Sequence, residues 1–367
     1  MVAAPDGPHS EAFAALRVDS STLAIALVFP LRGPAGLFGA SCELCAQLAV
    51  EEINDGGGVL GRQLRLIPVD GGAPPAAVAA EVGALVSLGA VQAVTGWHTS
   101  AVRQALAPRI ADRVPYVYTA LYEGGERTPG VYLTGETPSS QLLPGMSLLA
   151  SELGARRWCV VGNDYIWPRK SAQAARSYAR ILGARICAEV YVPLGTDDFT
   201  ATLRTIEECE ADAVLMLLVG EDAVHFNRAF GQSGLDARCV RLTTLMDENM
   251  LLATGADATR ALYVTAGYFE TLTTVESMDF AGRYARRFGV EAPAVGSLGE
   301  SCYEGVRLLA ALIAGARSAK AGDISRVADT VSYEGPRGRL SLSGGHVAQR
   351  VYLAEADAMH FSVIAQL

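Results

Sequence analysis

Residues 22–70 decide the fold and read TLAIALVFP-LRGPAGLFG-ASCELCAQLAVEEIN-DGGGVLG-RQLRLIPVD. The first nine residues form a short apolar run ended by Pro30, which is typical of a buried strand. A turn rich in glycine and proline follows, and the spacing of apolar residues then predicts a helix over Ala40–Asn54. After the turn DGGGVLG, residues 62–70 predict a second strand. Strand, helix and strand in this order are the unit of a parallel α/β sheet.

The alternation of strands and helices continues along the chain and restarts after residue 140. We expect further strands at 91–96, 114–119, 157–164, 184–193, 211–220, 240–244 and 263–269, and helices at 76–88, 100–112, 142–153, 170–182, 199–209, 222–231, 278–288 and 298–319. Residues 338–367 alternate with period two, which indicates antiparallel strands. The fold class is therefore α/β, with two similar lobes, each a parallel sheet flanked by helices, and a cleft between the carboxyl ends of the two sheets.

Composition excludes several classes of protein. The chain has 367 residues, enough for two domains, and 50% of them are hydrophobic, which excludes a disordered chain. The net charge of −9 and the pI of about 5.2 argue against direct binding of nucleic acid. Apolar runs are too short to cross a bilayer, and the first 20 residues, a flexible arm by their composition, lack the pattern of a secretory signal. With seven cysteines in no paired pattern, we expect a cytoplasmic protein, or an exported one if a signal was removed.

The sequence has no motif for catalysis, metal binding or cofactor binding in the structural context that such a motif requires. Gly56, Gly58 and Gly61 have dinucleotide-motif spacing but follow a helix and precede a strand, so they indicate a turn. Cys42 and Cys45 lie within a helical pattern and read as small apolar residues on one helix face. The sequence contains no hydrolase motif and no histidines at metal-ligand spacing. It has three acidic pairs, at 197–198, 207–208 and 247–248, of which the first two indicate solvated charge. We therefore predict no catalytic residues, no metal and no cofactor.

Hydroxyl and aromatic residues instead follow the ends of several predicted strands. Parallel strands bring their carboxyl ends to one edge of the sheet, so these residues should face the cleft together with free backbone N–H groups of the next helix. The candidate ligand-binding residues are Thr99, Ser100, Tyr118, Thr119, Ala120, Tyr165, Trp167, Gly220, Thr244 and Met246. Such a set offers neutral donors, acceptors and flat apolar walls.

Two longer stretches carry a family resemblance: AVEEINDGGGVLGRQLRLIPVD at 49–70 and VYLAEADAMHFSVI at 351–364. They resemble the helix-turn-strand and the closing hairpin of the type I periplasmic-binding-protein family, in its branch for branched-chain amino acids, amides and urea. GNDYIWPRKS at 162–171, with PYVYTALYEG at 115–124 and VYLTG at 131–135, looks closer to the amide sensor of the bacterial aliphatic amidase operon. One departure is that Thr119, Ala120 and Leu121 stand where the amide sensor has Pro-Thr-Pro.

The resemblance implies three hinge crossovers, near 135, 267 and 345. Lobe 1 would then hold residues 21–135 and about 268–344, and lobe 2 residues 136–267 and about 345–367. It also implies that Ser100, Tyr118, Tyr165, Trp167 and Thr244 contact the ligand, matching the family's motifs position by position.

The leading hypothesis is non-catalytic binding of a small neutral amide- or urea-like solute with hinge closure, in a cytoplasmic sensor that controls an antiterminator-type regulator. The alternative is the receptor of an ABC importer for branched-chain amino acids, amides or urea, with a membrane permease as partner. An ammonium ligand would need a carboxylate, for which Asp247 and Glu248 are candidates. A hydrolytic enzyme with either residue as general base is a minor alternative. Ligand identity and association between copies of the chain stay open.

Overall fold

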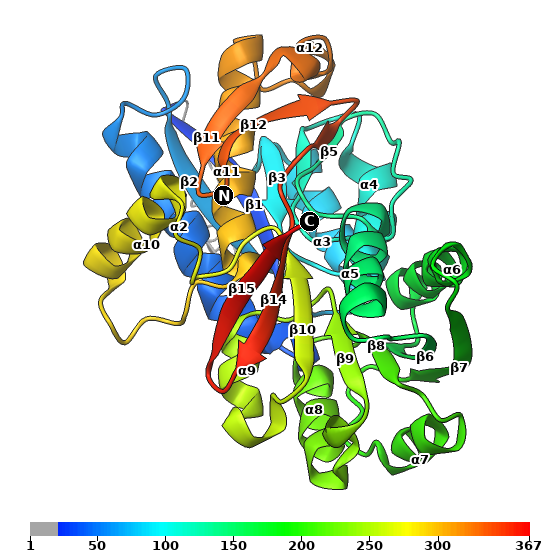
Figure 1. Cartoon of the computed structure of the whole chain (residues 1–367). Helices are drawn as coiled ribbons and strands as arrows, with labels where there is room; N and C mark the ends of the chain where they lie inside the picture. Colours follow the sequence, from blue (N-terminus) through cyan, green and yellow to red (C-terminus); the bar gives the residue numbers. More distant parts are fainter. Residues whose placement is uncertain (1–20) are drawn as a thin grey trace, which may run out of the picture.

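The computed structural model describes residues 21–367 and contains two mixed sheets, each with helices on its faces (Figure 1). The flexible arm predicted for residues 1–20 lies outside the described residues. Strand order is β11-β12-β13-β5-β4-β3-β1-β2 in the first sheet and β15-β14-β10-β9-β8-β6-β7 in the second. We call each sheet with its helices lobe 1 and lobe 2. The α/β fold with two similar lobes is as predicted.

In the first sheet β1 to β5 run parallel and β13 pairs parallel with β5, while β12 and β11 add antiparallel pairings at the edge. Its strands are β1 Thr22–Phe29, β2 Gln63–Asp70, β3 Ala93–Gly96, β4 Tyr116–Tyr118, β5 Val131–Leu133, β11 Ser332–Gly335, β12 Gly338–Ser343 and β13 His346–Val347. The second sheet is parallel from β6 to β10 and gains an antiparallel hairpin, β14–β15. Its strands are β6 Arg157–Asn163, β7 Arg185–Val192, β8 Ala213–Leu217, β9 Val240–Thr243, β10 Leu262–Ala266, β14 Tyr352–Asp357 and β15 His360–Gln366.

Helices cover the faces of both sheets because their apolar sides need burial. Helix α2 packs on α11, α3 on α4, α5 on α6, and α8 on α9. The helices are α2 Gly39–Asp55, α3 Pro75–Ser87, α4 Ser100–Ile110, α5 Pro138–Glu152, α6 Ile166–Ile181, α7 Thr200–Glu208, α8 Glu221–Ser233, α9 Glu248–Thr254, α10 Val275–Phe288, α11 Ser297–Ala316 and α12 Ala321–Ser325, with 3-10 turns η1 Pro34–Phe38, η2 Leu235–Ala237, η3 Ala256–Ala258 and η4 Ala328–Thr330. None of the helices within residues 21–367 is both long and apolar enough to cross a membrane.

The chain passes between the two sheets three times. It leaves the first sheet after β5, returns from the second after β10, and leaves again after β13 to build β14 and β15. In Figure 1 these last two strands lie beside β10, although almost ninety residues separate them from it in sequence. The three connections therefore lie together between the lobes.

Several local predictions differ from the structure. Helix α5 begins four residues before its predicted start at 142, and the short helices α9 and α12 were not predicted. Helix α6 begins at Ile166, four residues before its predicted start, because Tyr165 is extended and serves as the N-cap. Strand β5 was not predicted, since its three residues are too few to give a periodic pattern. The glycines of DGGGVLG form the predicted turn between α2 and β2, where Gly57, Gly58 and Gly61 adopt positive φ.

Candidate functional site

Four helices of the two lobes begin in the cleft. Helix α4 follows β3 with Thr99 as N-cap, α6 follows β6 with Tyr165, α8 follows β8 with Gly220, and α9 follows β9 with Asp247. The first N–H groups of a helix have no acceptor within it, and the helix dipole adds positive potential there. The fold therefore directs several donors toward the cleft.

A cavity of about 280 Å³, which we call the outer cavity, lies between the lobes. Its walls are largely apolar, with Tyr165, Leu194 and Val219 from lobe 2 facing residues of lobe 1. The lobe 1 residues are Pro30, Arg32, Pro34, Ala35, Gly71, Gly72, Ala73, Pro74, Pro75, Trp97, Thr99, Ala101 and Val102. Space of this size and character suits a small ligand with an apolar part.

A second, smaller space of about 10 Å³, the inner cavity, lies deeper between the sheets. Trp97 lines both cavities and therefore separates them. The other lining residues of the inner cavity come from both lobes and from the connections between them: Thr119, Leu121, Glu136, Gln141, Thr244, Ala266, Tyr268, Ser297, Leu298, Glu300, Ser301 and Arg337. The lobes are thus in close contact here.

Several buried polar atoms around the inner cavity lack a hydrogen bond. Within residues 21–367 no partner is found for Trp97 Nε1, the Tyr268 hydroxyl or either carboxylate oxygen of Glu300. Glu300 is 0% exposed, and a buried polar group without a partner is costly. Burial raises the pKa of Glu300 well above its ordinary value, despite the lowering effect of nearby Arg337.

Arg337 contacts the first and the third of the connections between the lobes. Its Nε lies 2.9 Å from Glu304 Oε2 and 3.4 Å from Glu300 Oε1, and its Nη1 lies 3.9 Å from Glu136 Oε1 in the first connection. Nη1 also donates to Gln349 in the third connection. We call these five residues the hinge cluster. Three carboxylates thus surround one guanidinium.

The second connection also bonds to the hinge cluster. The Gly267 N–H donates to Glu136 Oε1 at 2.7 Å, and Gln349 Nε2 donates to the Thr134 carbonyl at 3.0 Å. Every segment that crosses between the lobes is therefore bonded into one buried ionic group.

Four of the residues predicted from strand ends line the cavities. Thr99 and Tyr165 line the outer cavity, and Thr119 and Thr244 line the inner one. Thr99 Oγ1 accepts from the Val102 N–H at 3.5 Å, as an N-cap does. Thr119 Oγ1 accepts from Ser301 Oγ at 3.2 Å. Both lobes thus contribute predicted residues to the cleft.

Three predicted residues of lobe 1 lie beside the cavities but do not line them. The Tyr118 hydroxyl donates to the His98 carbonyl at 2.8 Å, within the lobe. Ser100 Oγ accepts from Arg103 Nη1 at 3.4 Å. Ala120 is 1% exposed, and its carbonyl packs against Gly135.

The remaining predicted residues belong to lobe 2. Trp167 is 2% exposed and packs in the core from the first turn of α6, while Met246 Sδ accepts from Asn227 Nδ2 at 3.7 Å. Gly220, with φ 54°, marks a contact between the lobes: a Cβ there would lie 1.8 Å from the Pro34 carbonyl oxygen. Whether any of the ten residues contacts a ligand stays a prediction.

The acidic pair Asp247–Glu248 does not line either cavity. Asp247 accepts from the Met250 N–H at 3.0 Å as the N-cap of α9, and Glu248 accepts from the Glu270 N–H at 2.8 Å. Burial raises the pKa of Asp247 to about 6 and raises that of Glu248 well above its ordinary value. Neither carboxylate is placed to act on a ligand in the cleft.

Sequence reasoning missed Trp97, Glu300 and Arg337. Trp97 directly follows the predicted strand 91–96, so its position was a usable signal. Glu300 lies within a helix and Arg337 in the turn between β11 and β12, and no local pattern places either beside the cleft. The described residues contain no group of three or more histidine, cysteine or acidic side chains that could hold a metal.

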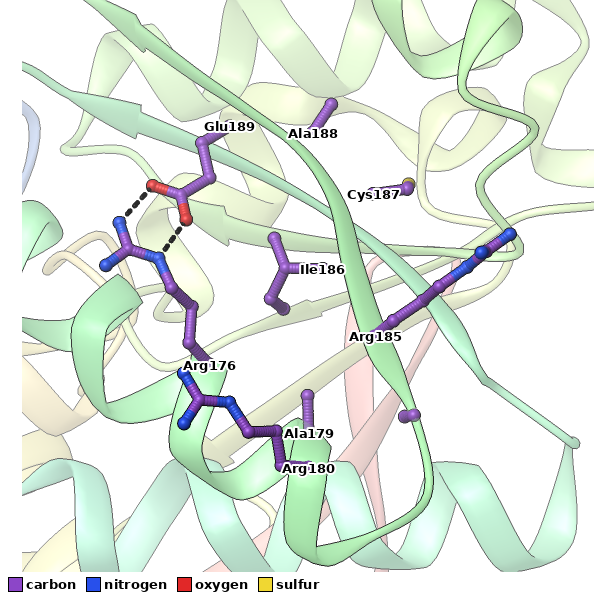
Figure 2. A pocket seen from close by; sticks show the side chains of 9 residues that line it. Arg176, Ala179, Arg180, Arg185, Ile186, Cys187, Ala188 and Glu189 are labelled. Atoms are coloured by element: carbon purple, nitrogen blue, oxygen red, sulfur yellow. Dashed lines mark hydrogen bonds and ion pairs between the residues drawn. The ribbon is translucent and has the colours of Figure 1, made fainter.

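A larger surface hollow of about 480 Å³ lies away from the cleft, between α6 and β7 (Figure 2). Arg176 and Glu189 form an ion pair across it, with Arg176 Nη2 2.7 Å from Glu189 Oε2. All of its lining residues belong to lobe 2, and none is among the predicted ligand-binding residues. We therefore place the candidate site in the cleft.

Known proteins match this chain over most of its length. Residues 22–360 match the model of the periplasmic binding protein family. The curated "Leu/Ile/Val-binding protein homolog 6" of Brucella melitensis biotype 1 is 24% identical over 299 residues, covering 77% of this chain and 74% of its own.

Two solved structures have the same fold. A solute-binding protein of an ABC transporter from R. palustris, in complex with benzoate, has a TM-score of 0.83 at 17% identity, covering 94% of this chain and 96% of its own. The branched-chain amino acid transporter substrate-binding protein LivJ from Streptococcus pneumoniae, in complex with isoleucine, has a TM-score of 0.81 at 20% identity, covering 94% and 100%. These relatives are solute-binding proteins, and none is an enzyme.

Proposed function

Because the chain belongs to the periplasmic binding protein family, we propose that it is the solute receptor of an ABC importer and that its solute is a small apolar amino acid held between the two lobes. This proposal takes up the alternative of the sequence analysis in place of its main hypothesis, a sensor for a neutral amide. The relatives named for leucine, isoleucine and valine, and the LivJ complex with isoleucine, support it.

The observation that carries the proposal is the carboxylate of Glu300. It is fully buried, lines the inner cavity, and neither of its oxygens has a hydrogen-bond partner within the described chain. The hinge cluster already holds three carboxylates against one arginine, so its charge favours a further cation. A ligand ammonium beside Glu300 would supply both the positive charge and the missing donors.

The outer cavity offers groups that could bind the carboxylate and the side chain of an amino acid. Thr99 begins α4, an 11-residue helix whose first N–H groups and dipole favour a carboxylate. Tyr165 and Val219 offer apolar surface from lobe 2 for the ligand side chain. Trp97 separates the two cavities, so a ligand reaching from Thr99 to Glu300 would require this ring to move and the inner cavity to widen.

Other solute classes fit these charges less well. A neutral amide or urea could bond to Thr119 and Thr244 but would add no positive charge beside Glu300, which shares Arg337 with two other carboxylates. A benzoate would bring a further negative charge toward a cluster that already holds three carboxylates and one arginine. The neutral amide nevertheless remains the direct competitor, because the resemblance to the amide sensor concerns motifs around Tyr118 and Tyr165.

In the proposed mechanism the ligand favours the closed arrangement of the lobes. Contacts from lobe 1 at Thr99 and Glu300 and from lobe 2 at Tyr165 and Thr244 can be made together only when the lobes are close, so binding shifts the equilibrium toward closure. The closed form would then be recognised by a membrane permease. The receptor role implies a location outside the cytoplasmic membrane, in contrast to the cytoplasmic location expected from the sequence.

A panel of ligands tests the solute class. Leucine, isoleucine and valine should each raise the melting midpoint of the purified protein by a few degrees at a hundredfold excess over Kd, and benzoate, acetamide and urea should not. Glu300→Gln should weaken amino acid binding at least tenfold, because a hydrogen-bonded charge is lost. The matched control is Glu334→Gln, whose side chain is 67% exposed and should leave binding unchanged. Stabilisation by benzoate or by amides alone would refute the proposed class.

An uptake experiment in cells distinguishes a transport receptor from a sensor. A strain lacking the gene should lose high-affinity uptake of the labelled amino acid that binds best, and the wild-type gene should restore it. Unchanged uptake, together with loss of the ligand's control over gene expression, would instead identify a sensor.

A further inference from the structure

Two cysteines at the far edge of lobe 2 lie close enough to react with each other. Cys187 Sγ and Cys209 Sγ are 2.9 Å apart, and both residues are half-buried. Cys187 belongs to β7, the edge strand of the second sheet, and Cys209 is the C-cap of α7. We propose that Cys187 and Cys209 form an intramolecular disulfide when the protein meets a disulfide oxidant.

The local fold explains why these two thiols meet. Trp158 pairs with Ile186 but Cys159 pairs with Ala188, so Cys187 is the extra residue of a β-bulge. Figure 2 shows Cys187 on the side of β7 opposite Ile186 and the Arg176–Glu189 pair. A disulfide bond is about 2.05 Å long, so the sulfur atoms need to approach by less than about 1 Å.

The neighbouring thiols make the pair selective. Cys159 and Cys239 are near the pair but are 0% and 1% exposed, whereas Cys187 and Cys209 can be reached from solvent. These cysteines do not form a metal site, since the described chain has no group of three or more ligands in suitable positions. Cys42 and Cys45 are fully buried on α2, so the predicted structural role of that C-x-x-C spacing is confirmed.

The reaction balances as two thiol–disulfide exchanges. The thiolate of one cysteine attacks the oxidant, a small disulfide such as oxidised glutathione, forming a mixed disulfide and releasing one glutathione thiolate. The second cysteine then attacks the protein sulfur of that mixed disulfide, forming the Cys187–Cys209 bond and releasing the second glutathione. The protein loses two protons and two electrons, and the oxidant becomes two thiols.

The bond would tie the edge strand to the helix that follows it. It would close a loop of 23 residues, from 187 to 209, and restrict the unfolded chain, which should raise the melting midpoint by roughly 5 °C. It would also hold the bulge that interrupts regular pairing at the sheet edge. The inference does not depend on which solute the cleft binds.

Thiol counting and peptide mapping test the proposal. Burial raises the pKa of Cys187 to about 12, which slows its reaction, so the full-length protein is treated with oxidised glutathione at pH 8.5 both folded and during refolding. After denaturation, five free thiols are expected in place of seven. Trypsin cuts after Arg204, so the bond should link peptides 186–204 and 205–228. Dithiothreitol should separate them.

Matched variants decide between this pair and its neighbours. Cys187→Ser and Cys209→Ser should each abolish the linked peptides and the rise in melting midpoint, whereas Cys159→Ser should preserve both. Seven free thiols after both treatments would overturn the proposal. A bond from either cysteine to Cys159 or Cys239 would overturn it equally.

Discussion

Replacing Arg337 with leucine should be one of the most destabilising single changes in the chain. The Arg337 side chain is 5% exposed, and the nearest carboxylates, Glu300 and Glu304, are 1% and 0% exposed. Removing one partner of a buried ion pair costs about 3–5 kcal/mol, because the remaining charge is left without compensation. Since Arg337→Leu leaves the Glu304 carboxylate without its ion pair, with Glu300 and Glu136 nearby, we expect about 3–5 kcal/mol at pH 7.5.

The cost should fall at lower pH. Burial raises the pKa of Glu300 and Arg337 lowers it, so without Arg337 this carboxylate should take up a proton more readily, and the penalty of Arg337→Leu should be smaller at pH 5 than at pH 7.5. Glu304→Gln in the same chain should restore part of the stability at pH 7.5, because it removes one of the charges that leucine cannot pair.

Urea unfolding followed by tryptophan fluorescence at both pH values measures these costs. The control is Arg339→Leu, two residues further along the chain, whose side chain is 74% exposed and lies 3.9 Å from Glu334; it should cost less than about 1 kcal/mol. If Arg337→Leu costs no more than Arg339→Leu, or if its cost is the same at pH 5 and pH 7.5, Arg337 does not compensate buried carboxylates.

Three further predictions follow from the structure. Burial raises the pKa of Asp247 to about 6, so ionisation of this carboxylate opposes folding. In urea unfolding, Asp247→Asn should therefore add about 2–3 kcal/mol of stability above pH 6 and none below about pH 4. Burial lowers the pKa of His98 to about 3, so stability should fall by about 1.4 kcal/mol per pH unit as the pH drops from 6.5 toward 3, a slope that His98→Gln removes. Gly220→Ala should weaken ligand binding at least tenfold in titration calorimetry, because the added Cβ would meet the Pro34 carbonyl of the other lobe. The control is Gly234→Ala, which is also at positive φ but has open space around it and should leave binding unchanged.

Local pattern was sufficient for the architecture. The run at 22–30 could only be a buried strand, and the restart of alternation after residue 140 predicted a second lobe, because each lobe repeats the same strand–helix unit. The parallel order also placed Thr99, Thr119, Tyr165 and Thr244 at one edge of each sheet, where they line the cavities.

The hinge cluster could not be predicted because its members come from distant segments. Glu136, Arg337 and Gln349 are brought together by the three connections between the lobes, and nothing near any of them in sequence marks a burial site. The burial of Trp167 was also not predicted, because its helix begins earlier than expected and the ring lies in the core.

The cysteines show how spacing alone can mislead about pairing. Cys42 and Cys45 have a motif spacing but are enclosed in the core between α2 and α11. Cys187 and Cys209 are 22 residues apart and carry no motif, yet the bulge in β7 brings their sulfur atoms together.

Calorimetric titration with isoleucine and with 3-methylpentanoate, which is isoleucine without its amino group, shows whether the cleft recognises a ligand ammonium. If the cleft pairs a ligand ammonium with Glu300, isoleucine should bind with one site per chain and 3-methylpentanoate should bind at least a hundredfold more weakly. Equal binding of the two compounds, or binding of 3-methylpentanoate alone, would show that Glu300 does not pair with a ligand ammonium.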